Sequence, residues 1–270
     1  MPEPVISATP KDVWASGAPY EAYVGRWSRR VATQFLHWLM PAPERVWLDV
    51  GCGTGALTQT ILAAAAPGEV QGIDPSEGFV AHARAQVRDP RAAFLVGDAQ
   101  ALPFEPERFD FVVAGLVLNF IPQPARAVAE MARVARAGGT VACYVWDYAG
   151  KMQLMRHFWN AVVALEPAAA DLDEGRRFPL CAADALQSLF EQAALDDVAV
   201  CAIDIDTHFN DFDDYWSPFL GGQGPAPAYA RALSEEKRAA LRERIRAGLP
   251  FALDGSIPLA ARAWAVRGRR

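Results

Sequence analysis

Residues 46–58 read VWLDVGCGTGALT. The apolar run around Asp49 predicts a buried strand, and the chain then turns through Gly51, Gly53 and Gly55 into a helical pattern. Glycine adopts positive φ angles without strain and, because it has no Cβ, lets a ligand approach the backbone closely. The first amides of the following helix favour an anionic group. The stretch therefore predicts a strand, a ligand-binding turn and a helix.

Short apolar runs alternate with helical patterns from Arg45 onward, which is typical of βαβ units and a parallel sheet. Strands are expected over residues 46–50, 69–74, 92–97, 109–115, 140–146, 198–206 and 259–267. Helices are expected over residues 56–65, 76–87, 123–136, 151–165 and 182–193. The pattern predicts an α/β fold with a doubly wound, seven-stranded, mostly parallel sheet.

Two segments rich in aromatic residues fall outside this alternation. We expect residues 1–44 to form an N-terminal helical lid, and residues 45–270 to form the main domain with an inserted cap at about 208–250. The aromatic residues are Trp14, Tyr20, Tyr23 and Trp27 in the first segment, and Phe209, Phe212, Tyr215, Trp216 and Phe219 in the second. They either line a pocket over the ligand or pack a small apolar cap.

The composition of the chain argues against several classes of function. The net charge of −6 argues against a nucleic-acid substrate, because proteins that neutralise many phosphates present a basic surface. Apolar runs are much shorter than the roughly 20 residues that cross a bilayer, and the N-terminus does not resemble a signal peptide. We therefore expect a cytoplasmic protein without a membrane span. The four cysteines form no CxxC pair, so no metal site is expected.

Further acids stand at the predicted ends of the next two strands. Asp74 follows the glycine turn by about 20 residues, where a carboxylate can accept both hydroxyls of a cofactor ribose. The third strand ends in Gly97-Asp98-Ala99, and an acid at that place can accept an adenine amino group. Three acids at three matching strand ends indicate one nucleoside-binding edge.

This combination resembles the class I S-adenosylmethionine-dependent methyltransferases, in particular the small-molecule, type 11 branch that includes quinone-biosynthesis enzymes. The similarity covers residues 45–147 and includes Leu102-Pro103-Phe104 and Arg136-Ala137-Gly138-Gly139, where Ala137 replaces the usual proline. The resemblance implies a Rossmann-like fold with S-adenosylmethionine as cofactor. It also implies direct in-line transfer of the methyl group to a small acceptor of apolar or aromatic character.

The resemblance also implies roles for individual residues. Asp49 would support the turn and the amino end of the cofactor, Asp74 would hold the ribose, and Asp98 would hold the adenine. An aromatic residue near the N-terminus would cover the cofactor. The implied cofactor-binding set is Asp49, Gly51, Cys52, Gly53, Gly55, Asp74, Pro75, Asp98, Ala99 and Tyr23.

Two other functions share parts of this pattern. The glycine turn also satisfies the GxGxxA pattern of NAD-dependent oxidoreductases, although no tyrosine is followed four residues later by a lysine. A non-catalytic cofactor-binding protein would need the same binding edge.

His157 and His208 are the candidates for a general base, because they lie on segments expected near the substrate. Residues 119–122, NFIP, are interpreted as the end of a strand and the start of the next helix. The acceptor and the oligomeric state do not follow from the sequence.

Overall fold

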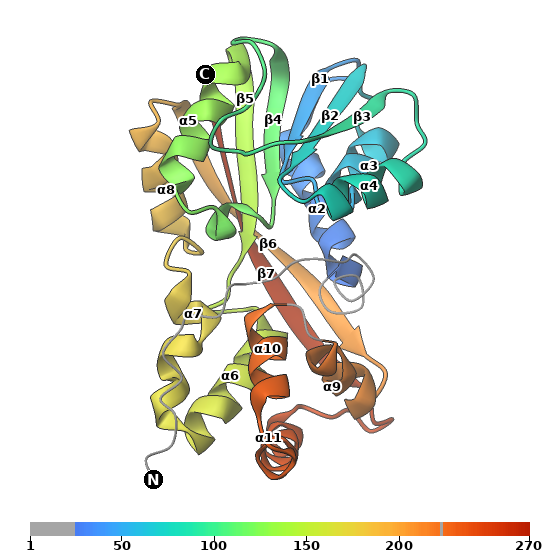
Figure 1. Ribbon diagram of the computed structural model, residues 1–270, viewed down its shortest axis with the longest axis vertical. Coiled ribbons are helices and arrows are strands. Elements are labelled where there is room, and N and C mark those ends of the chain that lie inside the picture. The colour runs from blue at the N-terminus through green and yellow to red at the C-terminus, as the bar shows by residue number, and fades with distance from the viewer. Residues whose placement is uncertain (1–24, 222–223) are drawn as a thin grey trace.

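The computed structural model describes residues 25–221 and 224–270, and within them one seven-stranded sheet has the order β3-β2-β1-β4-β5-β7-β6 (Figure 1). Strands β1 to β5 pair in parallel, and β7 runs antiparallel to both β5 and β6. The bounds are β1 Val46–Val50, β2 Glu69–Asp74, β3 Ala92–Val96, β4 Phe109–Gly115, β5 Ala135–Trp146, β6 Asp196–Phe209 and β7 Ile257–Arg269. The predicted doubly wound, mostly parallel sheet is confirmed.

Helices flank this sheet on both sides. They are α2 Arg26–Leu39, α3 Ala56–Ala64, α4 Glu77–Gln86, η2 Leu118–Phe120, α5 Pro124–Val134, α6 Gln153–Leu165, η3 Pro167–Leu172, α7 Glu174–Arg177, α8 Ala183–Gln192, α9 Phe212–Leu220, α10 Pro225–Ala232 and α11 Glu235–Gly248. Helix α2 packs beside α3, and α5 beside α8, on opposite sides of the strands in Figure 1. The Ser76 hydroxyl caps α4 by accepting a hydrogen bond from the Phe79 amide at 3.3 Å.

One helix ends earlier than expected. The helix predicted over residues 123–136 ends at Val134, before Gly138 is reached. The cause is sheet pairing, because Ala135 is already the register partner of Phe109 in β4. Gly138, with φ of 73°, lies where the β4–β5 register shifts. Gly138 and Gly139 therefore lie in the first part of β5.

The main core lies between the sheet and its helices. Trp47 of β1 is fully buried and stacks on Phe111 of β4, with ring centroids 4.3 Å apart. Phe35 of α2 reaches across to Tyr144 of β5, at 4.8 Å between centroids. Burial of these aromatic side chains fixes the strands whose carboxyl ends form the site.

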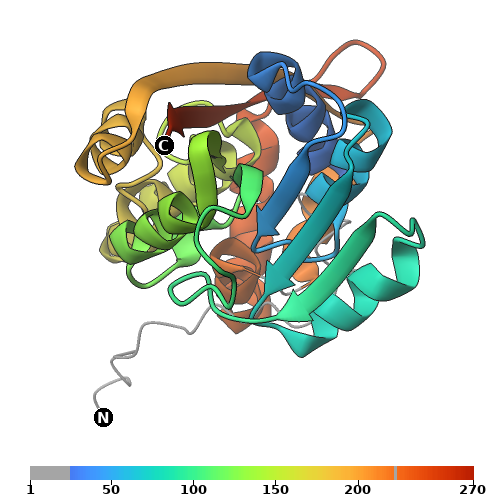
Figure 2. The same ribbon diagram turned by 90° about the horizontal axis from the view of Figure 1, so that it is seen from above.

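Strands β6 and β7 extend past the other strands, and α6, α9, α10 and α11 gather around this extension (Figures 1 and 2). We call these four helices the helical lobe. Phe219 of α9 stacks on Phe158 of α6 at 4.5 Å between centroids, and the Tyr215 hydroxyl donates to the Leu154 carbonyl at 2.8 Å. The insert thus has an apolar core that it shares with α6. No helix in residues 25–221 and 224–270 is long and apolar enough to cross a membrane.

Candidate active site

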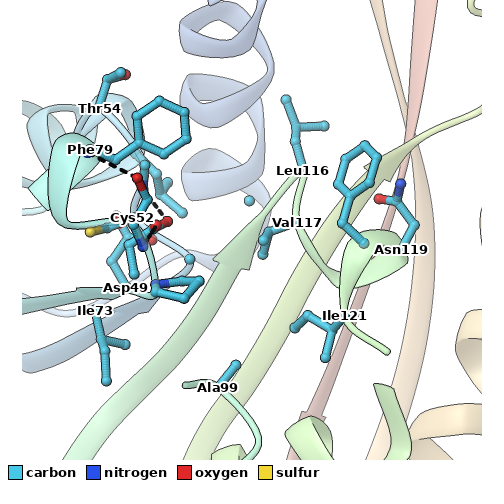
Figure 3. Close-up of a pocket in the computed structure, with 18 of the residues that line it drawn as sticks. Asp49, Cys52, Thr54, Ile73, Phe79, Ala99, Leu116, Val117, Asn119 and Ile121 are labelled. Carbon is cyan, nitrogen blue, oxygen red and sulfur yellow. Dashed lines mark hydrogen bonds between the residues drawn. The ribbon is translucent and has the colours of Figure 1, made fainter. Parts of the chain in front are cut away.

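A cavity of about 610 Å³ opens at the carboxyl ends of the parallel strands. Its wall includes Asp49 from β1, Asp74 from β2 and Gly115 from β4, and the segment after β3 adds Asp98 and Ala99 (Figure 3). Open α/β sheets bind their ligands at this edge. Small-molecule sites span about 300–1,000 Å³, so the cavity has the size of a cofactor or substrate site.

Asp49 is the deepest polar group in the wall. Its side chain is buried, and its Oδ2 accepts a 2.7 Å hydrogen bond from the Thr58 hydroxyl. Its Oδ1 is also buried but has no hydrogen-bond partner among the described residues. Burial raises the pKa of this carboxyl from 3.8 to about 7. A cationic group of a ligand would satisfy Oδ1 and favour the ionised form.

The three glycines of the turn have different tasks. All three have positive φ, but a Cβ on Gly51 would lie 2.6 Å from the Val117 side chain. A Cβ on Gly53 would meet no described atom within 4 Å, because it would point into open space. A Cβ on Gly55 would meet Val87 at 3.1 Å, and Gly55 is not part of the cavity wall. Gly51 and Gly53 therefore lie where a ligand can touch them, whereas Gly55 allows the turn to pack on α4.

Asp74 holds the turn as well as lining the cavity. Its Oδ2 accepts from the Gly53 amide at 3.0 Å, and its Oδ1 accepts from the Ser76 amide at 2.9 Å. Burial raises the pKa of Asp74, and the two amides oppose that shift. Each carboxylate oxygen can accept a further hydrogen bond, so ribose hydroxyls can still bind there. Pro75 and Cys52 line the same part of the wall.

Asp98 and Ala99, the residues predicted to bind adenine, lie in a turn that is held by hydrogen bonds between its own residues. Asp98 accepts from the Gln100 amide at 2.8 Å and from the Gln100 side chain at 3.1 Å. These hydrogen bonds lower the pKa of Asp98, so the carboxylate is ionised at neutral pH. Ala99 follows it in the cavity wall. The structure thus brings together every predicted cofactor residue that it describes except Gly55, and Tyr23 lies outside the described residues.

Sequence reasoning missed the opposite wall. It consists of the segment after β4 together with one residue each from β5 and the region before α8: Leu116, Val117, Asn119, Phe120, Ile121, Pro122, Tyr144 and Phe178. The interpretation of NFIP as a strand end was wrong, because β4 ends at Gly115 and the segment folds as the short helix η2. Its place beyond the carboxyl end of a parallel strand was the signal that could have identified it.

Leu116 marks this wall with an unusual backbone. Its φ of 60° lies in the left-handed region of backbone conformation, which residues other than glycine rarely adopt. Its amide donates to the Tyr144 carbonyl at 2.8 Å, which continues the pairing of β4 with β5. Such local strain is retained mainly where the surrounding structure needs it, often at binding sites.

The two histidines do not reach the cavity. His157 lies in α6 beside a second, smaller cavity near α11, and burial lowers its pKa. His208 is exposed on β6 and pairs with Pro258. Within the described parts of the chain, no histidine, lysine or arginine lines the main cavity. Neither histidine is placed where it could reach a ligand in this cavity, and their role as general bases stays a prediction that rested only on their position near an expected lid.

The insert aromatics do not line this cavity either. Phe209, Phe212, Tyr215, Trp216 and Phe219 are each at most 5% exposed and pack in the helical lobe. No residue of the insert contributes to the cavity wall as far as the chain is described. Of the two interpretations of these aromatics, packing of an apolar cap is the one that the structure supports.

Residues 48–143 match the profile of a methyltransferase domain. The chain carries a class I, S-adenosylmethionine-dependent methyltransferase domain. The demethylmenaquinone methyltransferase of Roseiflexus sp. (strain RS-1) is 41% identical over 96 residues, which cover 36% of this chain and 40% of the relative. The chain therefore spans about 40% of the length of such relatives, and the similarity lies in the methyltransferase domain.

Solved structures share the fold over more of the chain. Phosphoethanolamine N-methyltransferase 2 of Haemonchus contortus, in complex with phosphomonomethylethanolamine and S-adenosylhomocysteine, has a TM-score of 0.59 at 15% identity, covering 94% of this chain and 57% of its own. The [4+2]-cyclase SpnF has a TM-score of 0.55 at 18% identity, covering 97% and 88%. At these identities the likeness shows the fold alone, and the second example is named for a cyclisation.

Proposed function

We propose that this chain transfers a methyl group from S-adenosylmethionine to a small apolar acceptor. The observation that carries the proposal is the buried Oδ1 of Asp49, which has no partner among the described residues. It lies beside a turn in which Gly53 leaves open space toward the cavity. A ligand with a cationic amino end and a nucleoside fits these features.

The residues in the wall suit the whole cofactor. Asp49 would pair with its ammonium group, Asp74 would accept from its ribose hydroxyls, and Asp98 with Ala99 would bind its adenine. Bound there, the cofactor would supply an electrophilic methyl group on a sulfonium, which an acceptor takes by direct in-line displacement. The apolar wall after β4 would exclude water and hold the acceptor in line.

The wall also bears on the acceptor. The curated relative is named for demethylmenaquinone, which is a quinone-type molecule. The Haemonchus neighbour is solved with a phosphorylated amine. A phosphate would meet no lysine, arginine or histidine along the described part of this wall, and an unpaired buried charge is costly. An apolar, quinone-like acceptor therefore suits the cavity better.

Calorimetry with S-adenosylhomocysteine and with NAD tests the cofactor assignment. We expect binding of S-adenosylhomocysteine and none of NAD, because the wall offers an acid to the amino end. Binding of NAD alone would favour the oxidoreductase function instead. Incubation with methyl-labelled S-adenosylmethionine and a cell extract then separates an enzyme from a non-catalytic binding protein. Label in an organic-soluble product supports the proposal, and label that never leaves the cofactor contradicts it.

A further inference from the structure

We propose that Asn119 recognises the acceptor by donating a hydrogen bond from its side-chain amide to an acceptor oxygen of the phenol or enol type. The inference rests on the proposed function and deepens it, because it concerns the acceptor end of the same cavity. Asn119 is part of η2 and lines the cavity wall.

The amide of Asn119 is an unmatched donor. Its Nδ2 is buried and has no hydrogen-bond partner in residues 25–221 and 224–270. Nearly all buried polar atoms in native proteins have a partner, and a buried donor without one costs free energy. A ligand oxygen in the cavity would supply the missing partner.

The position of Asn119 separates it from the cofactor residues. In Figure 3, Ile73 and Ala99 lie toward the lower part of the cavity, whereas Leu116 and Asn119 lie across from the Asp49 turn toward the upper right. With Ala99 assigned to the adenine and Asp49 to the amino end, the Asn119 end remains for the acceptor.

The side chains around Asn119 favour a ligand that is apolar apart from one hydrogen-bonding group. Phe120 and Phe178 meet edge to face with centroids 5.1 Å apart, and Leu116 adds an aliphatic side chain. Aromatic and aliphatic walls of this kind bury flat apolar molecules and disfavour charged ones. A single amide in such a wall orients a ligand that carries one well-placed oxygen.

The wall also restricts how the acceptor loses its proton. The Cys52 thiol stays neutral, because burial raises its pKa well above the usual value. Asp98 accepts from Gln100 through both carboxylate oxygens. With no histidine or lysine in the described wall, a phenol or enol is suitable, since its hydroxyl proton can pass to solvent water before the cofactor and acceptor together exclude water from the cavity. The resulting oxyanion would then accept the hydrogen bond from the Asn119 amide, and this bond would offset the cost of burying the single charge in an apolar wall.

A pair of matched probes tests this inference on the full chain loaded with S-adenosylhomocysteine. The affinities of 1-naphthol and 1-methylnaphthalene are measured by titration, because the two molecules differ only by hydroxyl against methyl. We expect the wild type to prefer 1-naphthol by roughly tenfold, the scale of one buried hydrogen bond. Asn119→Leu should remove that preference while S-adenosylhomocysteine still binds. Asn160→Leu, which changes an exposed asparagine of α6, is the matched control and should keep the preference.

Each outcome of these titrations either supports or overturns the role of Asn119. No preference in the wild type, or a preference that survives in Asn119→Leu, overturns the role of Asn119. If the wild type fails to bind S-adenosylhomocysteine, the proposed function fails and this inference falls with it, whereas normal cofactor binding without a preference for 1-naphthol overturns this inference alone. If Asn119→Leu does not fold by circular dichroism, Asn119→Ala removes the same amide without added bulk and is expected to behave alike.

Discussion

Asp49 is the residue at which burial, charge and cofactor binding meet. Its pKa is raised to about 7 by burial, so the ligand-free protein holds a largely protonated carboxyl below that pH. A ligand ammonium pairs with the ionised form, and amino groups stay protonated below about pH 7.7. Affinity for S-adenosylhomocysteine should therefore weaken by roughly tenfold per pH unit as pH falls from 7 to 5.5. Calorimetry across that range measures it, and Asp49→Asn should bind more weakly and without this slope.

The same shift gives the ligand-free protein an opposite dependence on pH. The folded pKa lies above the ordinary value of 3.8, so the folded state holds the proton that the unfolded state releases. Stability should therefore fall as pH rises from about 4 to about 7, by a few kcal/mol, and then level off. Asp49→Asn should lack this loss in urea titrations. Equal pH slopes in both proteins would show that Asp49 is not the titrating group.

Gly53 allows the turn to be tested without disturbing the core. Gly53→Val should abolish binding of S-adenosylhomocysteine, because the added side chain enters the open space that faces the cavity. Gly138→Val is the matched control: Gly138 also has a positive φ, and a Cβ there would meet no described atom within 4 Å, but it is not in the cavity wall. Both should lose about 1–3 kcal/mol of stability through backbone strain. Normal binding by Gly53→Val would place the cofactor elsewhere.

At the residue scale, the sequence predicts acids and glycines better than bases. Asp49, Asp74 and Asp98 could be assigned because each stands at the end of a predicted parallel strand, and such ends meet at one edge. His157 and His208 were chosen for their chemistry, but nothing in their spacing tied them to that edge. Asn119 was passed over because a neutral amide has no conspicuous sequence signal. Its importance depends on a missing hydrogen bond, which only the packed structure reveals.

At the scale of the secondary-structure elements, the close contact of β4 with β5 depends on Gly115, which is the register partner of Tyr144. A Cβ on Gly115 would lie 2.6 Å from the Tyr144 hydroxyl and 2.8 Å from its ring, and the ring is buried. Gly115→Ala should therefore cost about 1–3 kcal/mol of stability through overpacking. Tyr144→Leu in the same chain should recover part of it. Thermal unfolding measures both, and Gly248→Ala at the end of α11, which meets no described neighbour within 4 Å, is the comparison that should lose no stability. A Gly115→Ala protein as stable as the Gly248→Ala protein would contradict the close approach.

Most elements could be predicted because local and long-range preferences agree. The expected strands 46–50, 69–74 and 109–115 coincide with β1, β2 and β4, whose apolar residues are buried by the sheet. The expected helix over 123–136 was too long, because the sequence shows the helix pattern but not the pairing of Ala135 with β4. Register between strands that are distant in sequence is a property of the assembled sheet.

At the scale of the whole molecule, the domain boundaries expected from the sequence remain predictions, but the aromatic insert has a clear place. Its rings complete the helical lobe around the extension of β6 and β7, beyond the carboxyl edge of the sheet (Figure 1). The aromatic content of the insert correctly predicted that these rings are buried. It could not predict whether they pack over the cavity or within a separate lobe. Both a lid and a packed lobe bury the same apolar area, so composition does not distinguish them.

Truncation of the insert core distinguishes these two roles. Phe219 is fully buried and stacked on Phe158, so Phe219→Ala should lose about 3–5 kcal/mol of stability. Phe251 is 41% exposed and is the matched control, because Phe251→Ala removes the same ring from a less buried site and should cost less stability. If the insert is a packed lobe, folded Phe219→Ala should bind S-adenosylhomocysteine as the wild type does, measured by calorimetry well below its melting temperature. A large loss of affinity in this variant, with Phe251→Ala unaffected, would show instead that the lobe helps to close the cavity.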